Sequence, residues 1–149
     1  MYDRILLSTD GTVASKRAEA HALDLAAAHD AVLHVLYVVD EDVVTAYSGD
    51  EYVDKAEGPE HGLEEHGEET LSQLRHRASE IDVDIETAMQ YGRPAETIVE
   101  YADDHDADLL VLGTKHRPEE YRALLGSVTD RVLRLTSRPA IVVKTGVKE

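Results

Sequence analysis

The sequence predicts an α/β protein in which helices sandwich a doubly wound, five-stranded parallel sheet. Short apolar runs of strand length alternate with longer segments in which apolar residues recur at helical spacing. Most of the short runs are apolar over nearly their whole length, as in parallel strands that are buried on both faces. Right-handed crossovers then bring helices to both sides of the sheet. The length of 149 residues and the 42% hydrophobic content fit a single domain, residues 1–149.

The first half of the chain contains two predicted strands, a helix and a long loop. The apolar run 4–9 is the first strand, followed by an Asp-Gly turn. In the segment 13–29, apolar residues recur at helical spacing with charged residues such as Glu19 between them, which predicts an amphipathic helix. The run 31–39 is a second buried strand. The acidic segment 41–62 contains several glycines and predicts a surface loop, with a lid as one interpretation.

The second half of the chain repeats this alternation. The segment 63–81 is a predicted helix, and the segment 83–89 alternates apolar and polar residues as a third strand. Another helix begins at Pro94, because proline in the first helical turn loses no hydrogen bond, and it ends near His105. The apolar run 107–113 is the fourth predicted strand.

The last predicted elements are a short helix and a fifth strand. A capping pattern at Ser127 predicts a helix that begins near Gly126. Three apolar residues are expected to be buried beneath it, namely Val128, Val132 and Leu135. Pro139 ends the helix, and the apolar run 140–144 follows as the fifth strand.

Acidic residues dominate the composition. Asp and Glu total 31 and Lys and Arg total 15, and the net charge of -16 disfavours nonspecific binding to nucleic acid or an anionic membrane. The scarcity of lysine and the absence of Phe, Trp and Cys favour adaptation to a salt-rich cytoplasm, with an ordinary acidic mesophilic protein as the alternative. Without cysteine there is no disulfide or thiolate chemistry. The sequence shows no recognisable signal peptide or membrane-spanning run, so we expect a cytoplasmic protein.

Candidate ligand-binding residues follow three of the strands. They are Thr9, Asp10 and Gly11 after the first strand, Val38 at the end of the second, and Gly113 and Thr114 at the end of the fourth. In open α/β sheets, ligands bind at the carboxyl ends of the strands, where the strand order reverses. The helix that begins near Gly126 adds unpaired N–H groups, and Ser127 and Thr129 add hydroxyls, all of which suit a phosphate.

The spacing of three glycine positions resembles that of nucleotide-binding universal stress proteins. Their pattern is Gly, two residues, Gly, nine residues, Gly, and then Ser or Thr. Here Gly113 opens the pattern, His116 stands in place of the second glycine, and Gly126-Ser127 closes the pattern after nine further residues. The segments ADLLVLG and RPAIVVK are also similar to that family. The chain is therefore identified as a member of it, and its acidity adds the expectation of a halophilic archaeal source.

The resemblance implies a Rossmann-like, adenine nucleotide alpha hydrolase-like fold and a site for ATP or a related adenine nucleotide. Near the adenine or ribose it implies Thr9, Asp10 and Gly11, with the backbone of Val38 at the adenine edge. Near the ribose and phosphates it implies Gly113, Thr114, Lys115, His116, Gly126, Ser127, Val128 and Thr129. It further implies a homodimer formed through the last strand, with a monomer as the alternative, and an unnamed protein partner that responds to the nucleotide state.

His116 leaves two functions open. If its position needs positive φ, a side chain there costs about 1 kcal/mol, and an imidazole could occupy the space of a phosphate. Against this, Lys115, His116 and Arg117 form a cation-capable triplet where a phosphate would lie. The protein is either a nucleotide-binding stress sensor or a family member that has lost nucleotide binding and acts as a dimeric interaction or protective module. An enzyme with adenylate chemistry would need a second substrate pocket, for which the chain leaves little length.

Other chemistries have less support. The patterns GxxxxGK[ST], GxGxxG and GxSxG are absent, which disfavours a P-loop NTPase, a dinucleotide dehydrogenase and a serine hydrolase. No general base is apparent, so we expect at most slow, partner-dependent ATP hydrolysis. Asp10 is a candidate contact for a Mg²⁺ that ATP carries, and equally a candidate helix cap or ribose acceptor. His61 and His66 lie near several glutamates and could bind a divalent metal, although scattered solvated histidines are the more common case.

Overall fold

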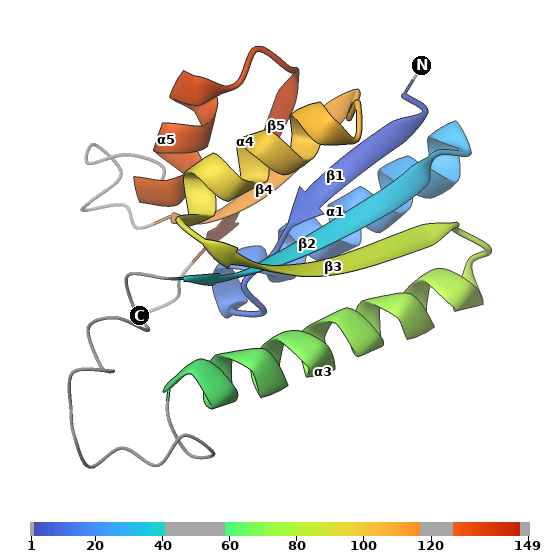
Figure 1. Ribbon diagram of the computed structural model, residues 1–149. Coiled ribbons are helices and arrows are strands. Elements are labelled where there is room, and N and C mark those ends of the chain that lie inside the picture. Colours follow the sequence, from blue (N-terminus) through green and yellow to red (C-terminus); the bar gives the residue numbers. More distant parts are fainter. Residues whose placement is uncertain (1, 41–58, 117–126, 147–149) are drawn as a thin grey trace, which may run out of the picture.

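The computed structural model describes residues 2–40, 59–116 and 127–146 (Figure 1). Within these ranges, strands and helices alternate in the order that the sequence predicts. The elements are β1 (Arg4–Ser8), α1 (Val13–His29), β2 (Val32–Asp40), α3 (Pro59–Glu80), β3 (Ile85–Gly92), α4 (Pro94–Asp104), β4 (Leu109–His116), α5 (Ser127–Leu135) and β5 (Ala140–Gly146).

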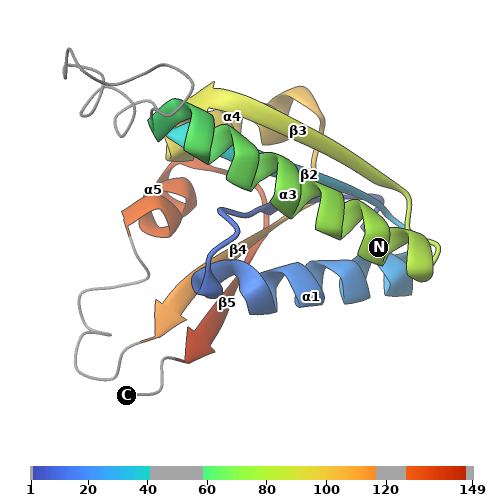
Figure 2. The same ribbon diagram turned by 90° about the horizontal axis from the view of Figure 1, so that it is seen from below.

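The strands form one five-stranded sheet in the order β3-β2-β1-β4-β5, and every pairing is parallel. Helices α1 and α3 cover one face of the sheet, and α4 and α5 cover the other (Figures 1 and 2). The chain therefore winds outward from β1 through β2 and β3, and then crosses over to wind the other way through β4 and β5. The predicted doubly wound α/β fold is confirmed, and the strand order reverses between β1 and β4.

The central strands supply side chains to a core on each face of the sheet. In β1, Ile5 and Leu7 belong to the core cluster beneath α1 and α3, whereas Leu6 belongs to the cluster beneath α4 and α5. Successive residues of a strand point to opposite faces, so burial on both sides requires an unbroken apolar run. The helices are apolar on one side only, and none of those in the described ranges is long and apolar enough to cross a membrane.

Several predicted boundaries are wrong. Helix α3 begins at Pro59 rather than at residue 63, so residues 59–62 of the predicted loop are helical, with proline in the first turn. The rest of that loop, residues 41–58, lies outside the described part of the chain. Strand β4 continues beyond Gly113, because its pairing with β5 runs on as far as His116 and Gly146.

Two predictions about burial are also wrong. Helix α5 buries Val132, but Val128 and Leu135 are 38% and 45% exposed. The side of α5 that faces the sheet carries Thr129 and Val132, so the other two apolar residues lie on its margins. The carboxylate residue Glu19, which the helical pattern assigns to the polar side of α1, is only 2% exposed.

Candidate functional site

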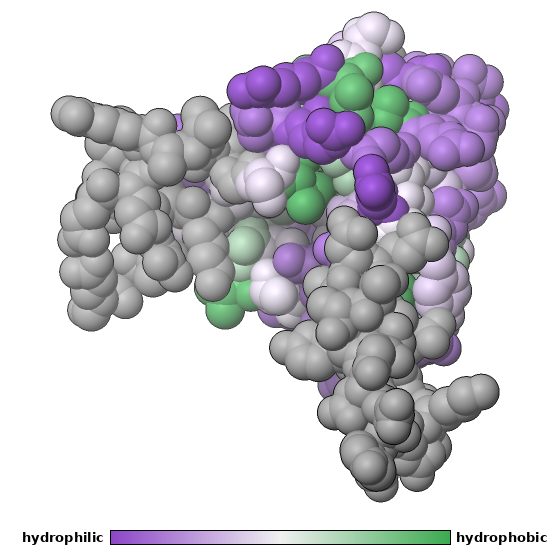
Figure 3. Space-filling model, turned by 60° about the vertical axis from the view of Figure 1, so that its left-hand side comes forward, coloured by the Kyte–Doolittle hydropathy of each residue, from purple (hydrophilic) through white to green (hydrophobic). Residues whose placement is uncertain are grey.

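An open pocket of about 370 Å³ lies at the carboxyl ends of β1, β2 and β4, where the strand order reverses. Six predicted site residues line it, namely Thr9, Asp10, Val38, Gly113, Val128 and Thr129. The wall also contains Ser8, Thr12, Ser15, Tyr37, Asp40, Leu63, His66, Pro94, Ile98 and Leu112. Figure 3 turns this side of the molecule forward and shows apolar residues exposed among pale and hydrophilic ones. The pocket therefore combines an apolar wall with hydroxyls and carboxylates.

Asp10 fixes the loop between β1 and α1. Its Oδ1 atom accepts hydrogen bonds from the backbone N–H of Thr12 (2.9 Å), the Thr12 hydroxyl (2.6 Å) and the Ser15 hydroxyl (2.9 Å). Burial acts to raise the pKa of Asp10, but the hydrogen bonds from Thr12 and Ser15 outweigh it and lower the pKa below its ordinary value. The side chain is therefore a carboxylate at neutral pH, and at the rim of the pocket it holds the turn that leads into α1, whose N-cap residue is Thr12.

Gly11 cannot be replaced without a clash. Its φ of +72° lies in the left-handed region, and a Cβ atom there would lie 2.4 Å from the Nε2 of His66 and 2.4 Å from the hydroxyl oxygen of Thr70. The Gly11 N–H donates to the hydroxyl oxygen of Thr9 over 3.0 Å. Gly11 thus allows the β1–α1 loop to pack closely against α3. It is not among the residues that line the pocket.

The end of β2 presents backbone groups to the pocket. Strand β1 pairs with β2 only as far as Ser8 and Leu36, and the Thr9 N–H donates to the Leu36 carbonyl oxygen over 3.1 Å. Successive residues of a strand direct their N–H and C=O groups alternately toward its two neighbours. The N–H and C=O of Val38 therefore point to the same side as those of Leu36, beyond the end of β1. They place a donor and an acceptor side by side at the pocket wall.

Two pocket residues that sequence reasoning missed are Tyr37 and His66. The Nε2 of His66 donates to the backbone oxygen of Asp10 over 2.9 Å, and its ring meets the Tyr37 ring edge-on with centroids 5.9 Å apart. Burial, and then the charge of Asp10, raise the pKa of Tyr37, so its hydroxyl stays protonated. Tyr37 belongs to an apolar run that predicts core, and no local pattern links His66 to Asp10.

The metal site that His61 and His66 suggested gains no support. Among the described residues, no group of three or more His, Asp or Glu side chains could hold a metal ion. His66 instead hydrogen-bonds to the β1–α1 loop, and the side chain of His61 lies outside the described part of the chain.

Gly113 lies within β4, where α1 and α5 both contact it. A Cβ atom at this position would lie 2.4 Å from the carbonyl oxygen of Ala14 in the first turn of α1. On the other face of the sheet, the Thr129 hydroxyl donates to the Gly113 carbonyl oxygen over 3.2 Å. The expectation that Gly113 ends its strand is wrong, and the close approach of α1 requires glycine here.

The remaining predicted residues do not line this pocket. Thr114 is buried in β4, and Ser127 lines a neighbouring cleft that also contains Arg93 and Arg131. The backbones of Lys115 and His116 pair with β5. The side chains of these two residues, and the whole of Arg117 and Gly126, lie outside the described part of the chain.

These features define a Rossmann-like α/β protein with a pocket at the topological switch point of its sheet. The chain belongs to the universal stress protein family, because the model of that family matches residues 1–144. A universal stress protein of Methanocaldococcus jannaschii is 38% identical over 149 residues, which cover 100% of this chain and 86% of that protein.

Solved structures of related proteins agree with the fold. The universal stress protein UspA from Lactobacillus plantarum is 29% identical, with a TM-score of 0.71 and coverage of 95% of this chain and 97% of that one. A universal stress protein whose crystal structure is in complex with cAMP is 25% identical, with a TM-score of 0.66 and coverage of 97% and 98%.

Proposed function

We propose that this protein binds an adenine nucleotide, ATP foremost, and regulates a stress response as a homodimer. The single observation that carries the proposal is the pocket at the switch point, which Asp10, Val38, Gly113 and Thr129 line together. The family membership and the cAMP bound to a related protein support the same ligand class. The proposed site retains the twelve residues named from the sequence, together with Tyr37 and His66.

The backbone of Val38 is our candidate for base recognition. Its N–H and C=O lie side by side beyond the end of β1, on an otherwise apolar wall that includes Ile98 and Leu112. Adenine offers the complementary pair, because its N6 amino group donates and the adjacent ring nitrogen accepts. Guanine presents the opposite polarity at these two atoms. The proposed contact therefore favours adenine over guanine.

The ribose and phosphates then extend toward α5. Asp10 is a carboxylate at the rim and suits a ribose hydroxyl, or a Mg²⁺ that ATP carries. Gly113 lines the same pocket, and the first turn of α5 directs backbone N–H groups toward the same edge of the sheet. The phosphate contacts of residues 114–116 and 126–127 remain part of the proposal.

The proposal also includes an oligomeric state and a cellular setting. We propose that two protomers meet through β5, which is the edge strand beside β4 in the described sheet, because edge strands can pair with another chain. As the sequence indicates, we also propose that the protein is a single domain, that it works in a salt-rich cytoplasm, and that it hydrolyses ATP slowly at most.

Isothermal titration with Mg-ATP and Mg-GTP in molar KCl tests the base contact. Wild-type protein should bind ATP with micromolar affinity and GTP at least tenfold more weakly. Val38→Pro removes the N–H donor and should weaken ATP binding at least tenfold. Val38→Ala keeps the backbone donor and should stay within threefold of wild type. Equal affinities of all three proteins for ATP would remove Val38 from the site.

His116→Gly separates nucleotide binding from the second candidate function, a dimeric interaction module. Binding by wild type shows that glycine at this position is dispensable. Binding by the variant alone shows that His116 blocks the site and that the interaction module is the better description. If neither protein binds, the nucleotide function is wrong for reasons beyond this residue.

A further inference from the structure

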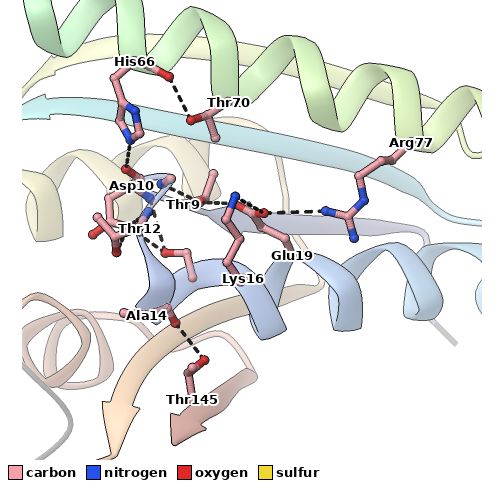
Figure 4. Close-up of polar contacts among 12 residues, drawn as sticks. Thr9, Asp10, Thr12, Ala14, Lys16, Glu19, His66, Thr70, Arg77 and Thr145 are labelled. Atoms are coloured by element: carbon pink, nitrogen blue, oxygen red, sulfur yellow. Dashed lines mark hydrogen bonds and ion pairs between the residues drawn. The ribbon is translucent and has the colours of Figure 1, made fainter. Parts of the chain in front are cut away.

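Helix α3 carries a stripe of polar side chains that faces the β1–α1 region. His66, Thr70 and Arg77 are spaced at i, i+4 and i+11, which places them on one side of a helix. His66 donates to the backbone oxygen of Asp10, and Arg77 pairs with Glu19 of α1 (Figure 4). The hydroxyl of Thr70 occupies the space into which a Gly11 side chain would project. The stripe thus contacts the β1–α1 loop and the helix that follows it.

Glu19 lies at the centre of these contacts. It is only 2% exposed, although it is a carboxylate, and its neighbours in α1, Ala18 and Ala22, belong to the core cluster beneath α1 and α3. One oxygen, Oε2, accepts a hydrogen bond from the Thr9 hydroxyl over 2.7 Å. The other, Oε1, lies 3.7 Å from the Nζ of Lys16 and 3.6 Å from the Nη1 of Arg77. A buried carboxylate is costly unless it is paired in this way, and an apolar side chain would fill the same space without that cost.

The contact with Thr9 gives this buried charge a role. Because a carboxylate can only accept, the Thr9 hydroxyl must direct its proton at Glu19. Its lone pairs are then free for the Gly11 N–H, which donates to them over 3.0 Å. Thr9 and Gly11 flank Asp10, so the Thr9 hydroxyl connects Glu19 to the turn that carries the Asp10 carboxylate. Figure 4 shows Thr9 between Glu19 and Asp10.

We propose that Glu19 is a positioning residue for the nucleotide pocket, and that it sets the affinity by fixing Thr9 and, through Thr9, the Asp10-Gly11 turn. This inference rests on the proposed function. It adds to that function a residue that contacts no ligand and lies outside the pocket wall. Arg77 and Lys16 hold the Glu19 carboxylate in place, so Arg77 of α3 stabilises the site although it does not line the pocket.

Three variants and a control separate positioning from general stability. Glu19→Leu fills the site but removes the acceptor, and it should weaken Mg-ATP binding at least tenfold. Thr9→Val removes the hydroxyl and should weaken binding to a similar degree. Glu19→Gln keeps a carbonyl oxygen for Thr9 and should restore binding to within threefold of wild type. Val83→Ala shortens a buried side chain of the same core cluster away from the pocket, and it should bind as wild type does.

Amide hydrogen exchange at Gly11 gives a readout that needs no nucleotide. Its N–H should exchange at least tenfold faster in Glu19→Leu and Thr9→Val than in wild type, and at an unchanged rate in Val83→Ala. Unchanged Gly11 exchange in Glu19→Leu, or binding of this variant within threefold of wild type, overturns the positioning role. If Glu19→Leu releases the Gly11 amide while wild type binds no nucleotide, the proposed function fails and control of the turn by Glu19 stands.

Discussion

The two ends of the parallel strands use polar groups in different ways. At the amino ends, side chains bind the backbone of the connecting segments: Asp108 accepts the N–H groups of Asp3 and Arg4, both over 2.9 Å, and Arg138 donates to the carbonyl oxygen of Ala107. At the carboxyl ends, side chains fix one loop and leave the backbone of Val38 facing a pocket. One end is organised to hold the strands together, and the other to hold a ligand.

The direction of the helices explains the difference. In a sheet of parallel strands joined by helices, every helix begins at the carboxyl ends of the strands and ends at their amino ends. Helix N-termini offer unpaired N–H groups and partial positive charge, which an anion can use. Helix C-termini offer carbonyl groups, and at the end of α4 the ring of His105 donates to one of them, the carbonyl oxygen of Tyr101. We therefore expect substitutions at the carboxyl ends to change binding, and those at the amino ends to change stability alone.

Gly113→Ala should have the largest effect. The added Cβ atom would lie 2.4 Å from a backbone oxygen of α1, which cannot move as a side chain end can, so we expect a loss of about 3 kcal/mol in the free energy of unfolding. Gly62→Ala is the matched control, because the structure has nothing within 4 Å of its added Cβ. It should stabilise α3 by about 0.5–1 kcal/mol. Urea unfolding measures both, and equal stabilities would contradict the close approach of α1.

Asp108→Ala should cost about 1–2 kcal/mol of stability and leave nucleotide affinity unchanged, because it removes the acceptor of two backbone N–H groups far from the pocket. The backbone hydrogen bonds from Arg4 and Asp3 lower the pKa of Asp108. Its stabilising effect is therefore complete above about pH 4 and is lost as the pH falls through the lowered pKa. Asp108→Asn keeps an acceptor and should recover part of the loss. A changed ATP affinity in either variant would break the division between the two ends.

The sequence predicted the sheet better than it predicted the pocket. Unbroken apolar runs identify strands buried on both faces, because each face of the sheet has its own core, and the order of elements then implies the switch point. The N-terminal turn of α3 escaped prediction because Pro59 and Gly62 are typical of loops. Glu19 escaped because a helical pattern assigns every carboxylate to the solvent side, whereas its burial depends on Arg77 in a different helix.

The pocket residues also show how far local sequence patterns can predict a site. Asp10 lies just after β1, and Thr129 lies in the first turn of α5, so local sequence patterns identify both residues. Tyr37 resembles core because it lies in an apolar strand, and His66 reaches Asp10 across 56 positions of sequence. Such contacts depend on how α3 packs over the β1–α1 loop, and periodicity within one element does not contain that information.

His34 should make stability fall in mild acid through the amino end of the sheet. The ring is 5% exposed, its Nδ1 lies 3.1 Å from the Tyr101 hydroxyl and 3.4 Å from a Glu86 oxygen, and His105 and Arg4 also face it. Burial lowers its pKa; Glu86 acts in the opposite direction, and His105 and Arg4 lower the pKa further. His34 therefore binds a proton more readily in the unfolded chain than in the folded chain. As a result, the free energy of unfolding falls as the pH drops below about 6.5.

His34→Gln provides the comparison for that pH dependence. Unfolding free energies at pH 5, 6, 7 and 8 should show a smaller loss between pH 7 and pH 5 for the variant than for wild type. ATP affinity at pH 7 should be the same for both proteins. A wild-type stability that rises toward pH 5 would mean that Glu86 outweighs burial at this site.

Arg4→Ala should have the smallest effect and thereby show what stabilises the amino end. Arg4 lies 3.9 Å from Asp106, and their side chains are 53% and 78% exposed. Exposed pairs of this kind contribute about 0–1 kcal/mol, and molar KCl shortens the Debye length to about 3 Å. We therefore expect a change in unfolding free energy of at most about 0.5 kcal/mol at low salt, and no measurable change in molar KCl. The Arg4 N–H still donates to Asp108 in this variant, so a loss above about 1 kcal/mol at low salt that disappears in molar KCl would show that surface charges, rather than satisfied backbone groups, hold this end together.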